Sequence, residues 1–329
     1  MKKSLGFFLR LAISLITMAA LVFALRGKFG EAFQIMRRGL RWEWLWIGAG
    51  VYVAATALIS RRLQLVFKVQ EVKVGFLQTF YLSFVGMFFN LFFPSAFGGD
   101  VAKGYFAYQY SGKKLGSLTG VLLDRLLGLV TLSGITLAAV TLYGHPLQVP
   151  AMKCSLYGWV GLLVFGAVFF THRRFAQKFQ FLFALIPSTQ LRQKLSDLYH
   201  AIREYRNHKQ LLFSCCIISV MAQFLFLAQN YFLSRALGIR ISPAPFFVLM
   251  PLVAFVSLAP SLSGLGVREA GFVFFFKSLI PTEQAFAVSL LFDLIFYGCA
   301  LAGGLVFAVK GGLKKEVLAG LEAVEEQET

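Results

Sequence analysis

Long stretches without a charged residue recur along the whole chain. They cover residues 74–99, 126–152, 154–171, 211–234 and 241–267. An apolar stretch of about 18 residues or more is long enough to cross a lipid bilayer as a helix. The pattern therefore predicts an all-α polytopic membrane protein with about eight transmembrane helices. We expect these spans at 5–25, 42–60, 76–97, 118–143, 155–171, 211–233, 245–260 and 285–309, with a short apolar piece at 271–280.

The spans are expected to share one bundle. Residues 1–310 then form a single transmembrane domain with two halves, 1–145 and 155–310, and residues 311–329 form a cytoplasmic tail. The polar segment 173–210 carries eight Lys or Arg residues and is expected in the cytoplasm, because basic loops stay on that side. The N-terminus is also cytoplasmic if residues 76–104 enter and leave the membrane on one side. Full crossing by this segment would place the N-terminus outside.

Two apolar segments are interrupted by proline and glycine in a similar way. PSAFGGDV at 94–101 and PSLSGLGV at 260–267 agree at four of eight positions and lie 166 residues apart. Proline removes a backbone donor, and glycine admits conformations closed to other residues, so both tend to end a helix. Interrupted spans at matching places in two halves are typical of transporters with inverted repeats. Two re-entrant segments in an inverted repeat are therefore predicted, and ordinary turns at helix ends are the alternative.

Charged residues follow each interruption directly. Asp100 and Lys103 follow the first, and Arg268 and Glu269 follow the second. A half-helix that begins at such a glycine directs the positive end of its dipole towards an anion. The two interruptions are therefore the predicted binding site for an anionic group.

Three more charged residues lie within apolar runs. Asp124 and Arg125 are adjacent, and they either belong to the same site or form a pair at the membrane interface. Asp293 is isolated inside the last span, where acids are costly and usually functional. Its candidate roles are proton coupling, a counter-ion for Arg268, or a carboxyl group kept neutral by burial.

The composition narrows the classes of partner. The chain is 58% hydrophobic and has a formal net charge of +17. Its basic residues lie in short loops beside apolar spans, so we expect anionic membrane lipids as partners and no nucleic acid. No spacing of Cys and His typical of a metal site occurs in the sequence. We therefore predict neither a metal nor a cofactor.

A set of residues around the interruptions carries a family resemblance. It consists of Asn90, Pro94, Gly98–Gly99–Asp100 and Lys103, then Asp124, Arg125 and Gly128, and in the second half ALGIRISPAPF at 236–246 and PSLSGLGVREAG at 260–271. Together they resemble the transmembrane region of lysylphosphatidylglycerol synthase (MprF-type) proteins. At position 124 the chain has Asp where this family more often has Glu.

The resemblance implies a multi-pass protein of a bacterial or archaeal inner membrane. In the fused synthases this region moves the lipid product across the membrane, and a separate soluble domain performs the aminoacyl transfer. The 20 residues after Val309 are too few for such a domain, so we expect a stand-alone member that moves a lipid or lipid-linked sugar. A lipid-synthesising enzyme or a glycosyltransferase is the expected protein partner.

The predicted function is therefore that of a lipid translocase without enzymatic activity. The alternatives are an intramembrane lipid-modifying transferase or its accessory subunit, with Asp100 and Glu269 as acid and base, and a small-solute secondary transporter. Asp293 is the predicted proton-coupling residue, and no catalytic residue is predicted. The predicted substrate-binding residues are Asn90, Pro94, Gly98, Gly99, Asp100, Lys103, Asp124, Arg125, Pro260, Gly264, Gly266, Arg268 and Glu269.

Overall fold

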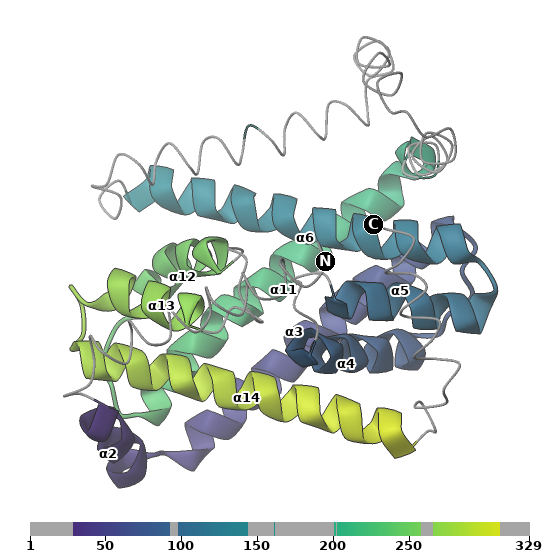
Figure 1. The fold of residues 1–329 in the computed structure, drawn as a ribbon. Helices are drawn as coiled ribbons and strands as arrows, with labels where there is room; N and C mark the ends of the chain where they lie inside the picture. The colour runs from purple at the N-terminus through teal and green to yellow at the C-terminus, as the bar shows by residue number, and fades with distance from the viewer. Residues whose placement is uncertain are drawn as a thin grey trace, which may run out of the picture. The chain divides into compact units, whose positions relative to one another are not determined.

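The described part of the chain is helical, with short connecting segments (Figure 1). The computed structural model describes residues 29–92, 98–143, 161, 201, 203–257 and 266–309. No strand occurs within these ranges, so the predicted all-α membrane fold is confirmed. The helices are α2 (Phe29–Gly39), α3 (Trp42–Val69), α4 (Phe76–Phe92), α5 (Gly98–Ser111), α6 (Lys114–Tyr143), α11 (Lys209–Ala236), α12 (Ala244–Val256), α13 (Val267–Phe276) and α14 (Thr282–Val309), with a 3-10 turn η1 (Tyr205–Asn207).

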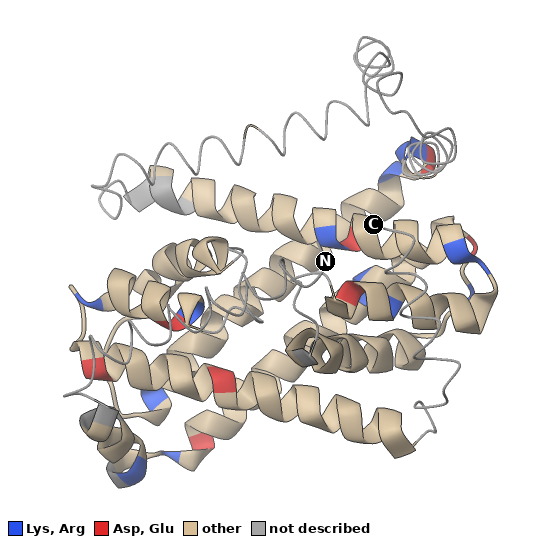
Figure 2. Cartoon of the chain, viewed as in Figure 1, with Lys and Arg blue, Asp and Glu red and all other residues tan. Residues whose placement is uncertain are grey.

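Four of the described helices are long and apolar enough to cross a membrane: α3, α6, α11 and α14. The 28 residues of α3, α11 and α14 each make a helix of about 42 Å, longer than the hydrocarbon core of about 30 Å. Figure 2 shows how few charged residues these helices carry. Helix α3 runs to Val69, past the end predicted at 60, because the charged Arg62 is accommodated inside the protein.

The chain forms two compact units. Unit 1 comprises Met1–Leu58, Phe80–Lys103 and Ala222–Thr329, and unit 2 comprises Ile59–Thr79 and Gly104–Met221. Helices α3, α4, α5 and α11 each contribute residues to both units. The predicted single domain with two sequence halves stays a prediction.

Helices α4 and α5 form a hairpin around residues 93–97, which we call the first hairpin. In unit 1, a Cβ atom on Gly99 would collide with the carbonyl oxygen of Gly86, so the two backbones touch where neither residue has a side chain. Asn90 Oδ1 accepts a hydrogen bond of 2.7 Å from the Gly99 N–H. Lys103, one turn further along α5, lies against Gly86. Because later residues of α4 meet earlier residues of α5, the two helices run antiparallel.

The two ends of the first hairpin meet in unit 2. Lys113, just after α5, forms an ion pair with Glu71, which precedes α4. The hydrogen bond from Lys113, together with its charge, lowers the pKa of the Glu71 carboxyl. The stabilisation is therefore present above the unfolded-state pKa of the carboxyl and is lost as the pH falls through the lower folded-state value. The residues on either side of the first hairpin therefore lie together, and re-entry of this segment into the membrane stays a prediction.

Helices α12 and α13 form the second hairpin, in unit 1. The rings of Phe246 and Phe276 have centroids 5.1 Å apart, whereas a Cβ on Gly271 would lie 3.8 Å from Val253 Cγ1. This pairing makes the two helices antiparallel. Gly266 precedes α13 with a φ of 80°, a conformation that glycine adopts without strain. Each interruption in the sequence therefore falls between, or at the start of the second of, two antiparallel helices.

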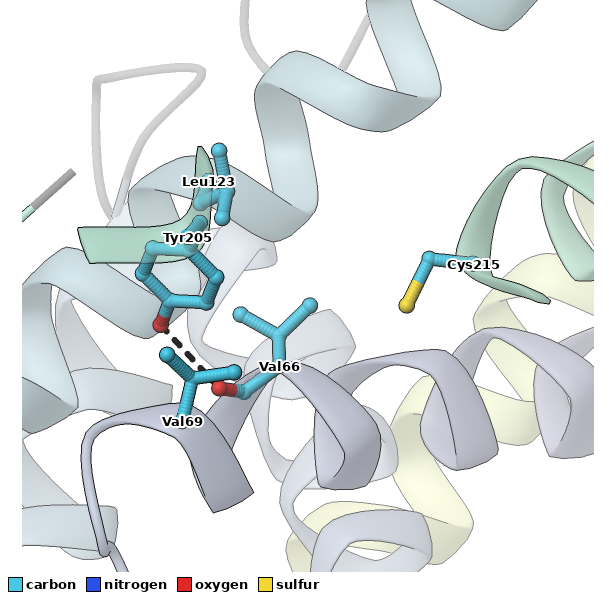
Figure 3. Packing of buried hydrophobic residues seen from close by; sticks show 5 residues of the cluster. All are labelled: Val66, Val69, Leu123, Tyr205 and Cys215. Carbon is cyan, nitrogen blue, oxygen red and sulfur yellow. Dashed lines mark hydrogen bonds between the residues drawn. The ribbon is translucent and has the colours of Figure 1, made fainter. Parts of the chain in front are cut away.

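A small apolar cluster in unit 2 surrounds a buried tyrosine (Figure 3). Its members are Val66, Val69, Leu123, Tyr205 and Cys215. The Tyr205 hydroxyl donates a hydrogen bond of 3.0 Å to the carbonyl oxygen of Val66. Burial raises the pKa of Tyr205, which therefore remains a neutral donor. The contact ties the segment before α11 to the end of α3.

Several predicted features lie outside the described residues. They include the spans at 5–25 and 155–171, most of the polar segment 173–210, and the tail at 311–329. Three predicted site residues also fall there: Pro94, Pro260 and Gly264.

Candidate functional site

Three charged residues of unit 1 meet where α13 packs against α14. Arg268 and Glu269 belong to the first turn of α13, and Asp293 lies near the middle of α14. Arg268 Nη2 forms an ion pair with Asp293 Oδ1 and lies 3.6 Å from Glu269 Oε1. We call these three residues the acid–base cluster. Asp293 is thus a counter-ion of Arg268, one of the roles considered from the sequence.

Aromatic side chains surround the guanidinium group of Arg268. Its Cζ lies 4.7 Å from the ring centroid of Phe292 and 5.5 Å from that of Phe296. Each contact of this kind contributes about 0.5–2 kcal/mol, more when water is excluded. Phe292 also meets the ring of Tyr52 edge-on, and the Tyr52 hydroxyl donates to Met87 Sδ at 3.6 Å. A continuous set of contacts therefore joins Arg268 to α4 of the first hairpin.

The acid–base cluster is buried and incompletely hydrogen-bonded. Glu269 is 1% exposed and Asp293 is 6% exposed. Within the described residues, Arg268 Nε and both carboxylate oxygens of Glu269 have no hydrogen-bond partner. Buried polar atoms in folded proteins are normally paired. The cluster therefore has unused capacity to bind a proton or a polar group.

The first hairpin carries its own acid and base close to the start of α5. Lys103 Nζ lies 3.2 Å from Asp100 Oδ1, and both side chains are largely buried. At the start of α5 the Gly99 N–H donates a hydrogen bond to the Asn90 side chain. At the start of α13 no capping side chain accepts such a hydrogen bond. The two hairpins thus resemble each other in architecture and differ in how their helix N-termini are satisfied.

Asp124 has a partner that sequence reasoning missed. In unit 2, Arg62 Nε donates to Asp124 Oδ1 at 2.7 Å, and Arg62 Nη1 donates to Ser219 Oγ at 2.7 Å. Arg62 is only 4% exposed. The contact was not predicted because Arg62 follows the predicted end of the span at residue 60 and was therefore expected in a loop. The pair ties α3, α6 and α11 together, and head-group binding by Asp124 and its neighbour Arg125 stays a prediction.

Comparison with protein families agrees with this picture. The description "Lysylphosphatidylglycerol synthase TM region" applies to a family whose profile matches residues 7–304. The chain belongs to this family. The match includes both hairpins and the acid–base cluster, so the resemblance expected from the sequence is confirmed. Comparison with curated proteins gives no match.

Side chains of the metal-ligating types are scattered over the described part of the chain. Within the described residues, no group of three or more His, Cys, Asp or Glu side chains is arranged to hold a metal ion. The prediction that the chain uses no metal and no cofactor stays a prediction.

Proposed function

We propose that this chain is a lipid translocase that moves an anionic head group across the membrane beside its two helical hairpins. The observation that carries the proposal is the pair of hairpins in a family of lipid-related membrane proteins, each with an acid and a base, at most 18% exposed, near the start of its second helix. A bacterial or archaeal inner membrane is the proposed location. A phospholipid or a lipid-linked sugar is the proposed cargo.

Arg268 is the proposed primary contact for the head group. Its side chain is 13% exposed, and two aromatic rings lie against the guanidinium group. An arginine binds phosphate through two parallel hydrogen bonds, and this interaction is strengthened where water is excluded. Lys103 provides a second positive charge in the first hairpin, with 17% of its side chain exposed.

The lipid tails do not require a polar route through the protein during translocation. Large apolar side chains on α11 and α14 are exposed, including Phe213 at 69% and Leu305 at 68%. In a bilayer such side chains face acyl chains at little cost. On this proposal the head group crosses along the hairpins while the tails remain in the lipid.

The test is reconstitution of the purified protein into vesicles of phosphatidylcholine that contain phosphatidylglycerol labelled on an acyl chain. Translocation is followed as loss of protection of the label from a membrane-impermeant quencher. We expect Arg268→Ala and Lys103→Ala each to slow translocation about tenfold or more, since a hydrogen bond to a charged group contributes about 1.5–3 kcal/mol. Asp100→Ala is expected to slow it as well, because Lys103 would lose its partner.

Arg240→Ala is the matched control, because Arg240 is exposed and follows α11 outside both hairpins. Its rate should equal that of the unaltered protein. Full translocation by both Arg268→Ala and Lys103→Ala would contradict the proposal. Mass spectrometry of the vesicle lipids should find no new species, and a modified lipid would favour a transferase instead.

A further inference from the structure

The acid–base cluster contains more acid than base. Arg268 contributes one positive charge, while Glu269 and Asp293 contribute two carboxyl groups that approach the same guanidinium nitrogen, Nη2. If both carboxyl groups were ionised, the three side chains would carry a net charge of −1 in a buried place. Two carboxyl groups that share one site resist simultaneous ionisation.

Neither α12 nor α14 carries a second base, and Arg37 on α2, which packs against α14, is exposed. Helix α12 has no ionisable side chain, and neither does the connection at 258–265. Helix α14 presents Tyr297 near Asp293 and Arg268, and α3 presents Tyr52, which lies near Cys299 and Arg268. Phenols and thiols are neutral at pH 7 in the absence of a strong perturbation. Within the described residues around the cluster, Arg268 therefore faces both acids without further positive charge.

A proton balances this charge better than a metal ion does. An unbalanced buried charge remains strongly unfavourable even after the surroundings relax, and proteins usually avoid it by protonation. Glu269 Oε1 lies 3.6 Å from Arg268 Nη2, so a metal cation bound to that oxygen would be repelled by the guanidinium group. The unpaired oxygens of Glu269 are, in contrast, well placed to hold a proton.

Head-group binding changes the charge of the same cluster. Arg268 Nη2 is engaged by Asp293, so an anion that takes this nitrogen displaces the carboxyl group. The two acids are then left without their base, while the anion adds a further negative charge. The cluster returns to neutrality only when a second proton binds.

We propose that the Glu269–Asp293 pair holds one proton while Arg268 is bound to Asp293, and that an anionic head group at Arg268 draws in a second proton. The second half of this inference rests on the proposed lipid translocation, and the first half does not. Anion movement and proton movement are thereby coupled through three side chains.

The first experiment detects the proton directly and does not depend on transport. Carboxyl groups with an ordinary pKa of about 4 are ionised at about pH 7. Infrared spectra of the protein in lipid nanodiscs at that pH should nevertheless show the carbonyl band of a protonated carboxyl group. Glu269→Gln and Asp293→Asn should each remove it, because the remaining acid is then neutralised by Arg268. Glu43→Gln is the control, since Glu43 is exposed at the start of α3, and it should keep the band. Spectra unchanged in both cluster variants would overturn the inference.

The second experiment measures the linkage in the vesicles described above. Between about pH 8 and pH 6 the rate should rise as the pH falls, by up to about tenfold per unit for one required proton. The double variant Glu269→Gln with Asp293→Asn should flatten this profile, since two amides leave no acid to take up the second proton. Glu269→Gln alone should keep the profile, because Asp293 still takes up one proton when the head group displaces it, and Glu43→Gln should keep it as well. A flat profile in the unaltered protein would overturn the coupling and leave translocation intact. Absence of translocation at every pH would overturn the proposed function, while the infrared result would still decide the first proton.

Discussion

At the scale of single residues, the contact between Arg62 and Asp124 shows how a charge can be buried in an apolar bundle. Arg62 Nε and Nη1 each make a hydrogen bond of 2.7 Å, to Asp124 and Ser219. Both charged side chains of the pair are at most 10% exposed. Water cannot replace a lost partner at such a place, so each residue depends strongly on the other.

The dependence predicts the effect of removing one partner. We expect Asp124→Ala and Arg62→Ala each to lower the free energy of unfolding by about 3–5 kcal/mol, because an uncompensated buried charge remains. The thermal unfolding midpoint in detergent measures this effect. Arg61→Ala is the matched control, since Arg61 is the exposed neighbour on the same helix.

Replacing both partners provides a sharper test. The double variant Arg62→Met with Asp124→Leu should recover most of the loss, because apolar residues in place of a buried ion pair are often neutral or stabilising. A double variant as unstable as the sum of the two single variants would show that the pair is not the source of the effect.

At the scale of elements, close contact between glycine and a neighbouring helix holds the first hairpin against α14. A Cβ on Gly303 would lie 2.5 Å from the carbonyl oxygen of Phe84, and a Cβ on Gly304 would collide with the ring of Phe88. Since a backbone oxygen cannot move aside as a side chain can, the helices would have to separate. The same helix carries Asp293, so α14 contacts both hairpins of unit 1.

Gly303→Ala should therefore destabilise the protein and slow translocation. We expect a cost of about 1–3 kcal/mol from overpacking, visible as a lower thermal midpoint. Gly298→Ala is the matched control on the same helix, because a Cβ there meets nothing within 4 Å. It should leave the midpoint unchanged or raise it slightly, since alanine favours a helix by about 0.5–1 kcal/mol over glycine. Equal midpoints for the two variants would contradict this interpretation.

At the scale of the whole molecule, the two hairpins lead to a prediction of the side from which each one enters the membrane. Helices α3 and α11 are antiparallel in unit 1, where Trp44 stacks with Phe232 and Tyr52 meets Phe226 edge-on. The first hairpin follows α3 along the chain, and the second follows α11. We therefore expect the hairpins to enter the membrane from opposite sides, as an inverted repeat requires.

Labelling of single cysteines tests this expectation. In a background without the native cysteines, Lys73→Cys and Lys114→Cys should react with a membrane-impermeant maleimide from the same side, because they flank the first hairpin. Ser278→Cys, after the second hairpin, should react from the other side. Labelling of Lys73→Cys and Lys114→Cys from opposite sides would mean that the segment crosses the membrane.

The all-helical membrane fold and the separation of α4 from α5 and of α12 from α13 follow from the sequence alone. The length of an apolar run decides whether a helix can span the bilayer, and proline and glycine change the local backbone. These effects can be predicted without knowing which other helices pack nearby. The same local signals marked Arg268, Glu269 and Asp293 as unusual.

Only the tertiary structure decided which of these residues meet. Asp293 pairs with Arg268, Asp124 pairs with Arg62, and Gly86 touches Gly99 because helices distant in sequence pack together. Arg62 looked like a loop residue, since an isolated arginine in an apolar helix is too costly to expect. Its cost is offset by Asp124, 62 residues further along the chain, and such compensation depends on packing that local sequence does not encode.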